Sequence, residues 1–265
     1  MAYNLNNKLV IAISSRALFD LEEENQIFEK DGLDAYYKYQ LENEDKSLKK
    51  GTGYRLVENI LKINSFFSSD ERQVEVIILS KNNAATSLRI TNAINDLKLD
   101  IIRSAWTSGT NISNYLKAFK VDLFLSADDN DVLNAIENGV AAAKILHSNE
   151  NIHNISNEQV RIAFDGDAVL FSEESELVYK NHGLEAFIEH EKENRNNPLE
   201  MGPFAKLLLT IAKIQAKFPT DKSPIRTALV TARSAPTHER VIKTFNVWGV
   251  RVDEAFFLGG TNKYE

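Results

Sequence analysis

The sequence contains no cysteine among its 265 residues. Disulfides, thiolate catalysis and cysteine-based zinc sites are therefore excluded, and the composition is compatible with a reducing compartment. A long hydrophobic run is also missing, because the longest early apolar stretch, Leu9 to Ile13, is too short to span a bilayer or to form the core of a signal peptide. We therefore expect a soluble cytoplasmic protein without a membrane partner.

Long basic runs are absent as well, and the chain carries a formal net charge of -7 with a pI of about 5.4. Nucleic acid is therefore not expected as a partner. An acidic protein can still bind a phosphate compound where a metal ion or a few local cations face it. Hydrophobic residues make up 43% of the chain, which is enough for one large domain or two smaller ones.

The chain repeats itself at an offset of 151 residues, which places Ile11–Ala12–Ile13 on Ile162–Ala163–Phe164. At this offset, 12 of the 41 positions from 11 to 51 are identical without a gap. The same offset places Gly109–Thr110–Asn111 on Gly260–Thr261–Asn262, far downstream. We interpret the chain as two tandem copies of one fold.

The first copy is assigned to residues 1–149 and the second to residues 158–265. The polar stretch Asn149–Asn157 between them is the expected linker. Beyond Ile112, the first copy continues through a strand-like run, Val121 to Leu125, and a helix-like stretch that runs to Leu146. The counterpart of this part would begin after Lys263, so we expect the second copy to be truncated at its C-terminus.

Short apolar runs alternate with helix-prone segments in both copies. Lys8–Ile13, Val74–Leu79, Val160–Phe164 and Ala228–Val230 have the length and composition of buried strands. Helical patterns follow the second strand of each copy, around residues 85–97 and 237–247. This order predicts an α/β fold with a parallel, Rossmann-like sheet covered on both faces, with ligands at the carboxyl ends of the strands.

The strongest local signal is Asp165–Gly166–Asp167, which follows directly after a predicted buried strand. Glycine permits a turn that a bulkier residue would resist. Two nearby carboxylates repel each other, so the pair is best tolerated beside a cation, and oxygen ligands at a phosphate site favour magnesium. Such a pair suits phosphoryl transfer, in which one carboxylate attacks phosphorus and the other protonates the leaving oxygen.

Further polar residues follow the next predicted strand. Thr231 can supply a hydroxyl to a phosphate, and Lys263 can supply a cation. Arg233 and Ser234 are close enough in sequence to reach phosphate or ribose, although Ser234 could equally be the N-cap of the following helix. The predicted substrate-binding set is Thr231, Ala232, Arg233, Ser234 and Lys263.

An Asp-x-Asp pair after a first strand, followed by a threonine and a lysine, resembles the haloacid-dehalogenase-like hydrolases. The longer strings FDGDAVLFSEESE, HGLEAFIEHE, LVTARSA and DEAFFLGG resemble the cytosolic 5′-nucleotidase type I family. The first copy also resembles this family, through LVIAISSRALFDLEEENQIF, YLKAF and LFLSAD. The resemblance covers nearly the whole chain and implies a magnesium-dependent, cytoplasmic hydrolase of nucleoside 5′-monophosphates.

This resemblance implies that Asp165 is the nucleophile and Asp167 the general acid and base. It also implies that Mg²⁺ is held by the Asp165 side chain and the Asp167 backbone carbonyl, and that Thr231 and Lys263 bind phosphate. The family pattern includes a further acidic pair after another strand, which we expect in the segment that the second copy lacks. Two alternatives stay open, namely a phosphatase of other small phosphate esters and a catalytically silent nucleotide-binding protein.

The first copy carries Ser14, Ser15 and Arg16 where the second carries Asp165, Gly166 and Asp167. An arginine would repel a metal ion at that point, so we expect no hydrolase chemistry there. A scaffold role is favoured over a phosphate pocket for an effector nucleotide, formed by these residues and Ser80. A nucleotide effector and a homo-oligomer are left open as partners.

Three further predictions concern a cap, a core residue and an acidic run. Residues 172–225 are expected to include a small helical cap, an element that selects substrates and excludes water. Phe171 is expected in the core rather than against a base. The acidic run Glu22–Glu24 is expected to be a solvated face or a first helical turn, where negative charge favours the helix dipole.

Overall fold

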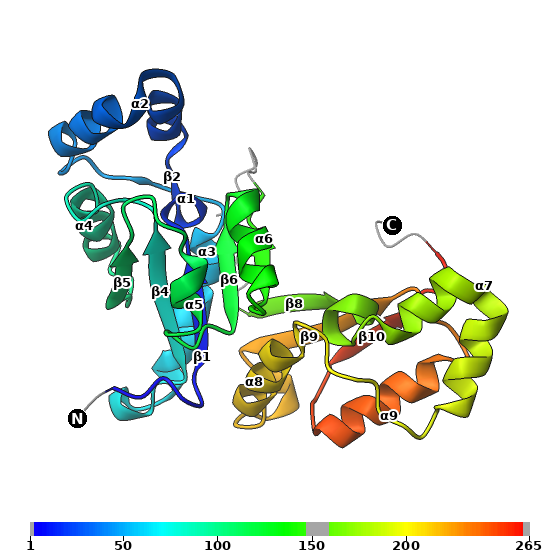
Figure 1. The fold of residues 1–265 in the computed structure, drawn as a ribbon. Helices are drawn as coiled ribbons and strands as arrows, with labels where there is room; N and C mark the ends of the chain where they lie inside the picture. Colours follow the sequence, from blue (N-terminus) through cyan, green and yellow to red (C-terminus); the bar gives the residue numbers. More distant parts are fainter. Residues whose placement is uncertain (1–2, 147–158, 262–265) are drawn as a thin grey trace. The chain divides into compact units, whose positions relative to one another are not determined.

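The computed structural model describes residues 3–146 and 159–261, and the chain divides into two compact units, Met1–Asn157 and Glu158–Glu265 (Figure 1). The expected linker Asn149–Asn157 and the predicted phosphate ligand Lys263 lie outside the described residues.

The first unit is built on a parallel sheet of five strands in the order β5-β4-β1-β6-β7. The strands are β1 (Leu9–Ile13), β4 (Val74–Ser80), β5 (Arg103–Trp106), β6 (Leu123–Ser126) and β7 (Ala142–Lys144). The prediction of an α/β fold with a parallel sheet is confirmed. β1 and β4 are almost continuously apolar because every residue of both strands is buried, as the sequence predicted.

Six α-helices accompany this sheet in the described part of the unit. They are α1 (Ser15–Leu18), α2 (Glu22–Glu42), α3 (Tyr54–Lys62), α4 (Leu88–Asp96), α5 (Ser113–Leu116) and α6 (Asp129–Glu137). Leu116 of α5 and Ala135 of α6 join one core cluster with Val10, Ile77 and Phe124 of the central strands. This cluster covers one face of the sheet with apolar side chains.

The predicted helix-like stretch to Leu146 is wrong beyond Glu137. α6 ends there, and Gly139 adopts a positive φ of 73° that a helix does not continue through. The apolar residues that follow form β7, at the edge of the sheet beside β6. A short apolar run after a glycine is equally compatible with a helix and a strand, and the glycine decides between them here.

The first unit contains a helical insertion between two short antiparallel strands, β2 (Phe19–Asp20) and β3 (Lys49–Lys50). The insertion contains α2, which is interrupted at Gly32 by a non-helical backbone with φ 84° and ψ -175°. Such a backbone strongly favours glycine. The acidic run opens α2, as expected, but Glu24 is buried rather than solvated, because it forms a 2.6 Å ion pair with Arg89.

The second unit has a three-stranded parallel sheet in the order β10-β9-β8. Its strands are β8 (Val160–Asp165), β9 (Ile225–Thr231) and β10 (Glu254–Phe257). Its helices are α7 (Glu174–Glu193), α8 (Ala205–Gln215) and α9 (His238–Trp248). α8 contributes a row of buried leucine and isoleucine side chains, which explains its apolar composition.

Equivalent strands of the two units begin at the same offset along the chain. β8 begins 151 residues after β1, and the same interval separates β9 from β4 and β10 from β5. The helical insertion recurs as well, because α7 is interrupted at Gly183 with φ 82° and ψ -175°, almost the values of Gly32. The internal sequence similarity is therefore accompanied by the same order of elements.

One cross-strand ion pair has opposite polarity in the two units. In the first unit Glu75 of β4 accepts from Arg103 of β5 at 2.6 Å, whereas in the second Arg226 of β9 donates to Glu254 of β10 at 2.7 Å. The environments differ, because the Glu75 side chain is 0% exposed and those of Arg226 and Glu254 are about 40% exposed. The same chemical pair is therefore buried in one unit and solvated in the other.

We expect Glu75→Gln to lower the free energy of unfolding by about 3–5 kcal/mol, because it removes the charge of a fully buried carboxylate that pairs with the partly buried Arg72 and Arg103. Arg226→Gln, at the equivalent position, should cost less than about 1 kcal/mol, because exposed pairs contribute little. Urea unfolding of both variants measures this difference. Equal losses in the two variants would contradict the assignment of one pair to the interior and the other to the surface.

Candidate active site

The carboxyl ends of β8 and β9 bring Asp165 and Thr231 to the same edge of the second sheet. The two strands pair in parallel, with Asp165 opposite Val230, so Thr231 lies one residue further along. A Cβ atom on Gly166 would lie 3.1 Å from Thr231 Oγ1 and 3.3 Å from its Cβ. Gly166 therefore lets the threonine side chain approach the backbone beside Asp165, which a side chain at that position would hinder.

An irregular turn, Gly166–Leu170, follows β8 and carries Asp167. The Asp165 carboxylate accepts from Gly166 N–H at 2.7 Å, and Phe171 N–H closes the turn by donating to the Gly166 carbonyl at 3.0 Å. Inside the turn, Asp167 is extended and Ala168 adopts a φ of 60° that non-glycine residues rarely take. Backbone strain of this kind is held only where the surroundings impose it, and it clusters at functional sites.

Arg233 holds the Asp167 carboxyl group with two of its nitrogens. Arg233 Nε donates to Asp167 Oδ2 at 2.9 Å and its Nη2 donates to Oδ1 at 2.5 Å. The Arg233 side chain is only 1% exposed, and its third nitrogen, Nη1, donates to Glu191 of α7. Burial lowers the pKa of Arg233, but the hydrogen bonds and charges of Asp167 and Glu191 outweigh it and raise the pKa above its ordinary value.

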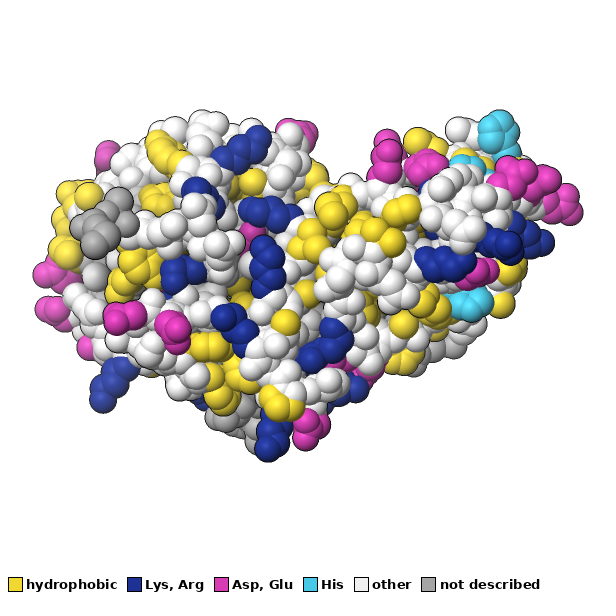
Figure 2. Space-filling view, turned by 90° about the horizontal axis from the view of Figure 1, so that it is seen from below, with side chains coloured by type: hydrophobic (Ala, Val, Ile, Leu, Met, Phe, Trp, Pro, Cys, Tyr) yellow, Lys and Arg dark blue, Asp and Glu magenta, His cyan; other side chains and the backbone are white. Residues whose placement is uncertain are grey.

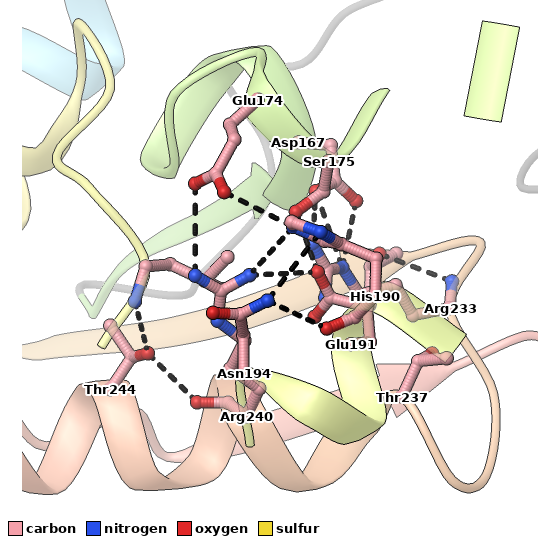
Figure 3. A network of polar contacts seen from close by, with 12 residues as sticks. Asp167, Glu174, Ser175, His190, Glu191, Asn194, Arg233, Thr237, Arg240 and Thr244 are labelled. Atoms are coloured by element: carbon pink, nitrogen blue, oxygen red, sulfur yellow. Dashed lines mark hydrogen bonds and ion pairs between the residues drawn. The ribbon is translucent and has the colours of Figure 1, made fainter. Parts of the chain in front are cut away.

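A polar network extends from Arg233 into α7 and α9, as Figure 3 shows. Glu191, with a fully buried side chain, also accepts from Arg240 of α9 and from Ser175 near the start of α7, at 2.9 and 2.7 Å. His190 lies 3.1 Å from Glu174 across the two segments of α7. The network therefore joins both segments of α7 to α9 and, through Arg233, to Asp167.

The other predicted substrate-binding residues occupy the loop after β9. Ala232 and Ser234 are exposed, and Ser234 is not the N-cap of α9, because that position belongs to Thr237. The chain leading toward Lys263 lies beside this loop, since Leu258 N–H donates to the Thr231 carbonyl and Gly259 N–H to the Arg233 carbonyl. Whether these residues bind phosphate stays a prediction.

Sequence reasoning missed Glu191 and Arg240. Glu191 lies in a helical segment with many acidic residues, and nothing in that pattern distinguishes the buried carboxylate from its exposed neighbours. The repeat carried a signal for Arg240, because it falls on Arg89 of the first unit, which also pairs with a buried glutamate. The prediction that Phe171 belongs to the core is confirmed, since it is 0% exposed and packs against Phe245 and Trp248.

The donor set of the turn suits a hard cation such as magnesium. It offers the Asp165 carboxylate and the main-chain carbonyl of Asp167, whereas both Asp167 side-chain oxygens contact Arg233. The described residues contain no group of three acidic or histidine side chains that could enclose a metal ion. These residues fit Mg²⁺ as it commonly binds at phosphate sites, through one or two protein oxygens with water and phosphate completing the shell.

The equivalent strand ends of the first unit carry hydroxyls that bond to one another. Ser15 Oγ lies 3.0 Å from Ser80 Oγ, and Ser126 donates to Ser14 at 3.3 Å. Arg16 forms a 3.0 Å ion pair with Glu22. The hydroxyls of these strand ends therefore contact one another, and the choice between a scaffold and a phosphate pocket for an effector stays a prediction.

The surface over α7 carries both charged and hydrophobic side chains, because Leu177, Tyr179 and Leu184 are exposed. Figure 2 shows acidic, basic and histidine side chains intermixed with hydrophobic ones on the part of the second unit that carries this helix. Within the described residues, no helix is both long enough and apolar enough to cross a membrane.

The fold and these strand ends define an α/β protein with a parallel sheet and a carboxylate-bearing turn at its carboxyl edge. A family model described as 5′-nucleotidase matches residues 1–265. The human protein cytosolic 5′-nucleotidase 1B is 37% identical over 266 residues, which cover 97% of this chain and 43% of that relative. The chain therefore belongs to the 5′-nucleotidase family. It spans less than half the length of this relative, and no solved structure matched in the comparison.

Proposed function

We propose that the protein hydrolyses nucleoside 5′-monophosphates to nucleoside and phosphate in the cytoplasm, with Asp165 as nucleophile and Asp167 as general acid and base. The observation that supports the proposal is that Asp165 and Thr231 end two neighbouring parallel strands, with Asp167 in the turn that follows Asp165, in a chain of this family. Ligands gather at this edge of open α/β sheets. The name of the human relative supports the reaction and the compartment.

In the first step, a carboxylate oxygen of Asp165 attacks phosphorus and the bond from phosphorus to the nucleoside O5′ breaks. Asp167 gives its proton to the departing oxygen, which leaves as the nucleoside hydroxyl. In the second step, water attacks the phosphorus of the aspartyl-phosphate and gives its proton to Asp167. The bond to Asp165 then breaks, and phosphate leaves with the enzyme restored.

The remaining residues of the site bind and orient the phosphate in this proposal. Thr231 donates its hydroxyl, Ala232 and Ser234 offer groups of the exposed loop, and Lys263 supplies the cation. The three guanidinium nitrogens of Arg233 bond to Asp167 and Glu191, so the predicted contact of Arg233 with substrate is not part of this mechanism. Mg²⁺, held by the Asp165 carboxylate and the Asp167 main-chain carbonyl, would neutralise phosphate charge when bound.

We also propose that the two units are tandem copies of a haloacid-dehalogenase-like fold and that α7 is the helical cap of the catalytic copy. The common offset of strands and helices supports duplication, and so does the recurrence of an interrupted helical insertion at the same point. The first copy, which carries Ser14 and Arg16 where the second carries Asp165 and Asp167, serves as scaffold. A nucleotide effector and a homo-oligomer stay open.

A substrate panel tests the proposed function in the full-length protein. We expect Mg²⁺-dependent phosphate release from AMP and related monophosphates at rates at least about tenfold above those from sugar phosphates, because binding energy from base and ribose assists the reaction. Chelation by EDTA should remove the activity and added Mg²⁺ should restore it.

Each alternative has its own result in this panel. Preference for sugar phosphates would favour a phosphatase of other small esters. Binding of AMP without phosphate release, measured by calorimetry, would favour a silent nucleotide-binding protein and contradict the proposed hydrolase.

A further inference from the structure

An arginine at the equivalent position of each unit is paired with a glutamate, but the two glutamates come from different positions of the helical insertion. In the first unit, Arg89 donates to Glu24 at 2.6 Å and to Gln40 at 3.3 Å. At the offset of 151 residues, Arg89 becomes Arg240, Glu24 becomes Ser175 and Gln40 becomes Glu191. The carboxylate therefore lies on the first segment of the helical insertion in the first unit and on the second segment in the second unit, whereas the arginine occupies the same position in both.

Glu191 also pairs with a second arginine, Arg233, which has no counterpart in the first unit. The position of Arg233 is occupied by Asn82 in the first unit, where the amide oxygen accepts from Tyr36 at 2.6 Å. In the second unit, Glu191 binds Arg240 through Oε1 and Arg233 through Oε2. The Phe187 ring replaces Tyr36 and lies 5.3 Å from the Arg233 guanidinium, a cation–π contact without a competing hydroxyl. Each difference favours an arginine at position 233.

Resting on the proposed function, we infer that Arg233 is a positioning residue, held by Glu191 of α7, that sets the orientation of the Asp167 carboxyl group. The guanidinium engages Asp167 through two nitrogens, and a planar bidentate pair fixes direction as well as distance. Asp167 precedes Ala168, whose φ of 60° is strained, in the turn after β8. Glu191 and Arg233 are both almost completely buried, so a shift of α7 would shift Arg233 and with it the Asp167 carboxyl group.

The first unit itself suggests the sharpest variant. Ser175→Glu combined with Glu191→Gln recreates the arrangement of Glu24 and Gln40, so Arg240 keeps a carboxylate and the charge of the cluster is unchanged. Arg233 loses its charged partner on α7 and retains only a neutral acceptor. We expect a thermal unfolding midpoint close to that of the wild type, with kcat lowered about tenfold and KM changed less than about threefold, because small misplacements of a catalytic group lower the rate strongly.

Arg233→Lys provides a second variant, because it keeps the positive charge but cannot form the bidentate pair. If orientation is the role, kcat should fall by a similar factor with KM nearly constant. A residue that acted only by attracting phosphate would show the reverse, namely a nearly normal kcat and a raised KM for Arg233→Gln together with rescue by lysine. That pattern would overturn the inference.

The control is Glu24→Gln, which disrupts the equivalent ion pair in the first unit and should leave kcat and KM unchanged. Hydrogen exchange of the amides of residues 166–171 is measured alongside, and the double variant should exchange faster there while Glu24→Gln does not. Unchanged kcat and unchanged exchange in the double variant would refute the inference. Absence of turnover in the wild type would refute the proposed function instead, and the exchange result would still decide the inference.

Discussion

Asp165→Asn is expected to abolish phosphate release, with a loss of about 10⁴- to 10⁶-fold in kcat, as for other enzymes that lose a covalent nucleophile. The amide is nearly isosteric with the carboxylate and keeps an oxygen that can accept from Gly166 N–H, as Asp165 does at 2.7 Å. The turn after β8 should therefore keep its shape, and the loss should be chemical. Steady-state release of phosphate from AMP measures it.

The matched control is Ser14→Ala, at the equivalent strand end of the first unit. We expect wild-type turnover for this variant, because Ser14 bonds to Ser126 in a cluster of hydroxyls that has no carboxylate nucleophile. Retained activity in Asp165→Asn would contradict the assignment of the nucleophile. Comparable losses in both variants would contradict the division into a catalytic and a scaffold unit.

Asp167→Asn is expected to lower kcat for AMP by about 10²- to 10⁴-fold, the usual contribution of a general acid and base. The amide can neither protonate the departing nucleoside oxygen nor take a proton from the attacking water. Both steps should slow, so the rate with a natural substrate does not separate them. Thermal unfolding serves as a check, because Arg233 loses its anionic partner in the turn.

An aryl phosphate separates the two steps in Asp167→Asn, because its leaving group needs no proton. The first step should then proceed while the second stays slow, and a phosphorylated Asp165 should accumulate. Rapid acid quench followed by peptide mass spectrometry detects it. A normal steady-state rate with no accumulation would show that Asp167 does not serve the second step.

The sequence predicted the central strands of the first sheet well, because β1 and β4 are almost wholly apolar and every residue of both is buried. The prediction that β8 is a buried strand is wrong in part, because Arg161, Ala163 and Asp165 are exposed. β1, β4, β8 and β9 were recognised from composition alone. β5, Arg103–Trp106, was missed, because four residues of mixed polarity carry no periodic signal. β10 was missed as well, because it is defined by its pairing with β9 and not by a pattern in its own four residues.

The candidate site was predicted in part for a related reason. Asp165 and Thr231 could be placed together because parallel strands present their carboxyl ends at one edge. The contacts of Arg233 could not be foreseen, since they depend on Glu191, which is 42 residues distant in sequence and belongs to an insertion. Side chains that meet through tertiary packing leave no local pattern, and here only the substitutions between the two units hinted at them.

The stereochemical course at phosphorus is the most direct test of the central claim that Asp165 attacks phosphorus. A nucleoside 5′-phosphorothioate, whose phosphorus is made chiral by sulfur and two oxygen isotopes, is hydrolysed in water labelled with the third oxygen isotope, and the configuration of the released chiral thiophosphate is determined. Two successive in-line displacements each invert the configuration, so the account predicts net retention. Net inversion would show that water attacks the substrate directly, and Asp165 would then not be the nucleophile.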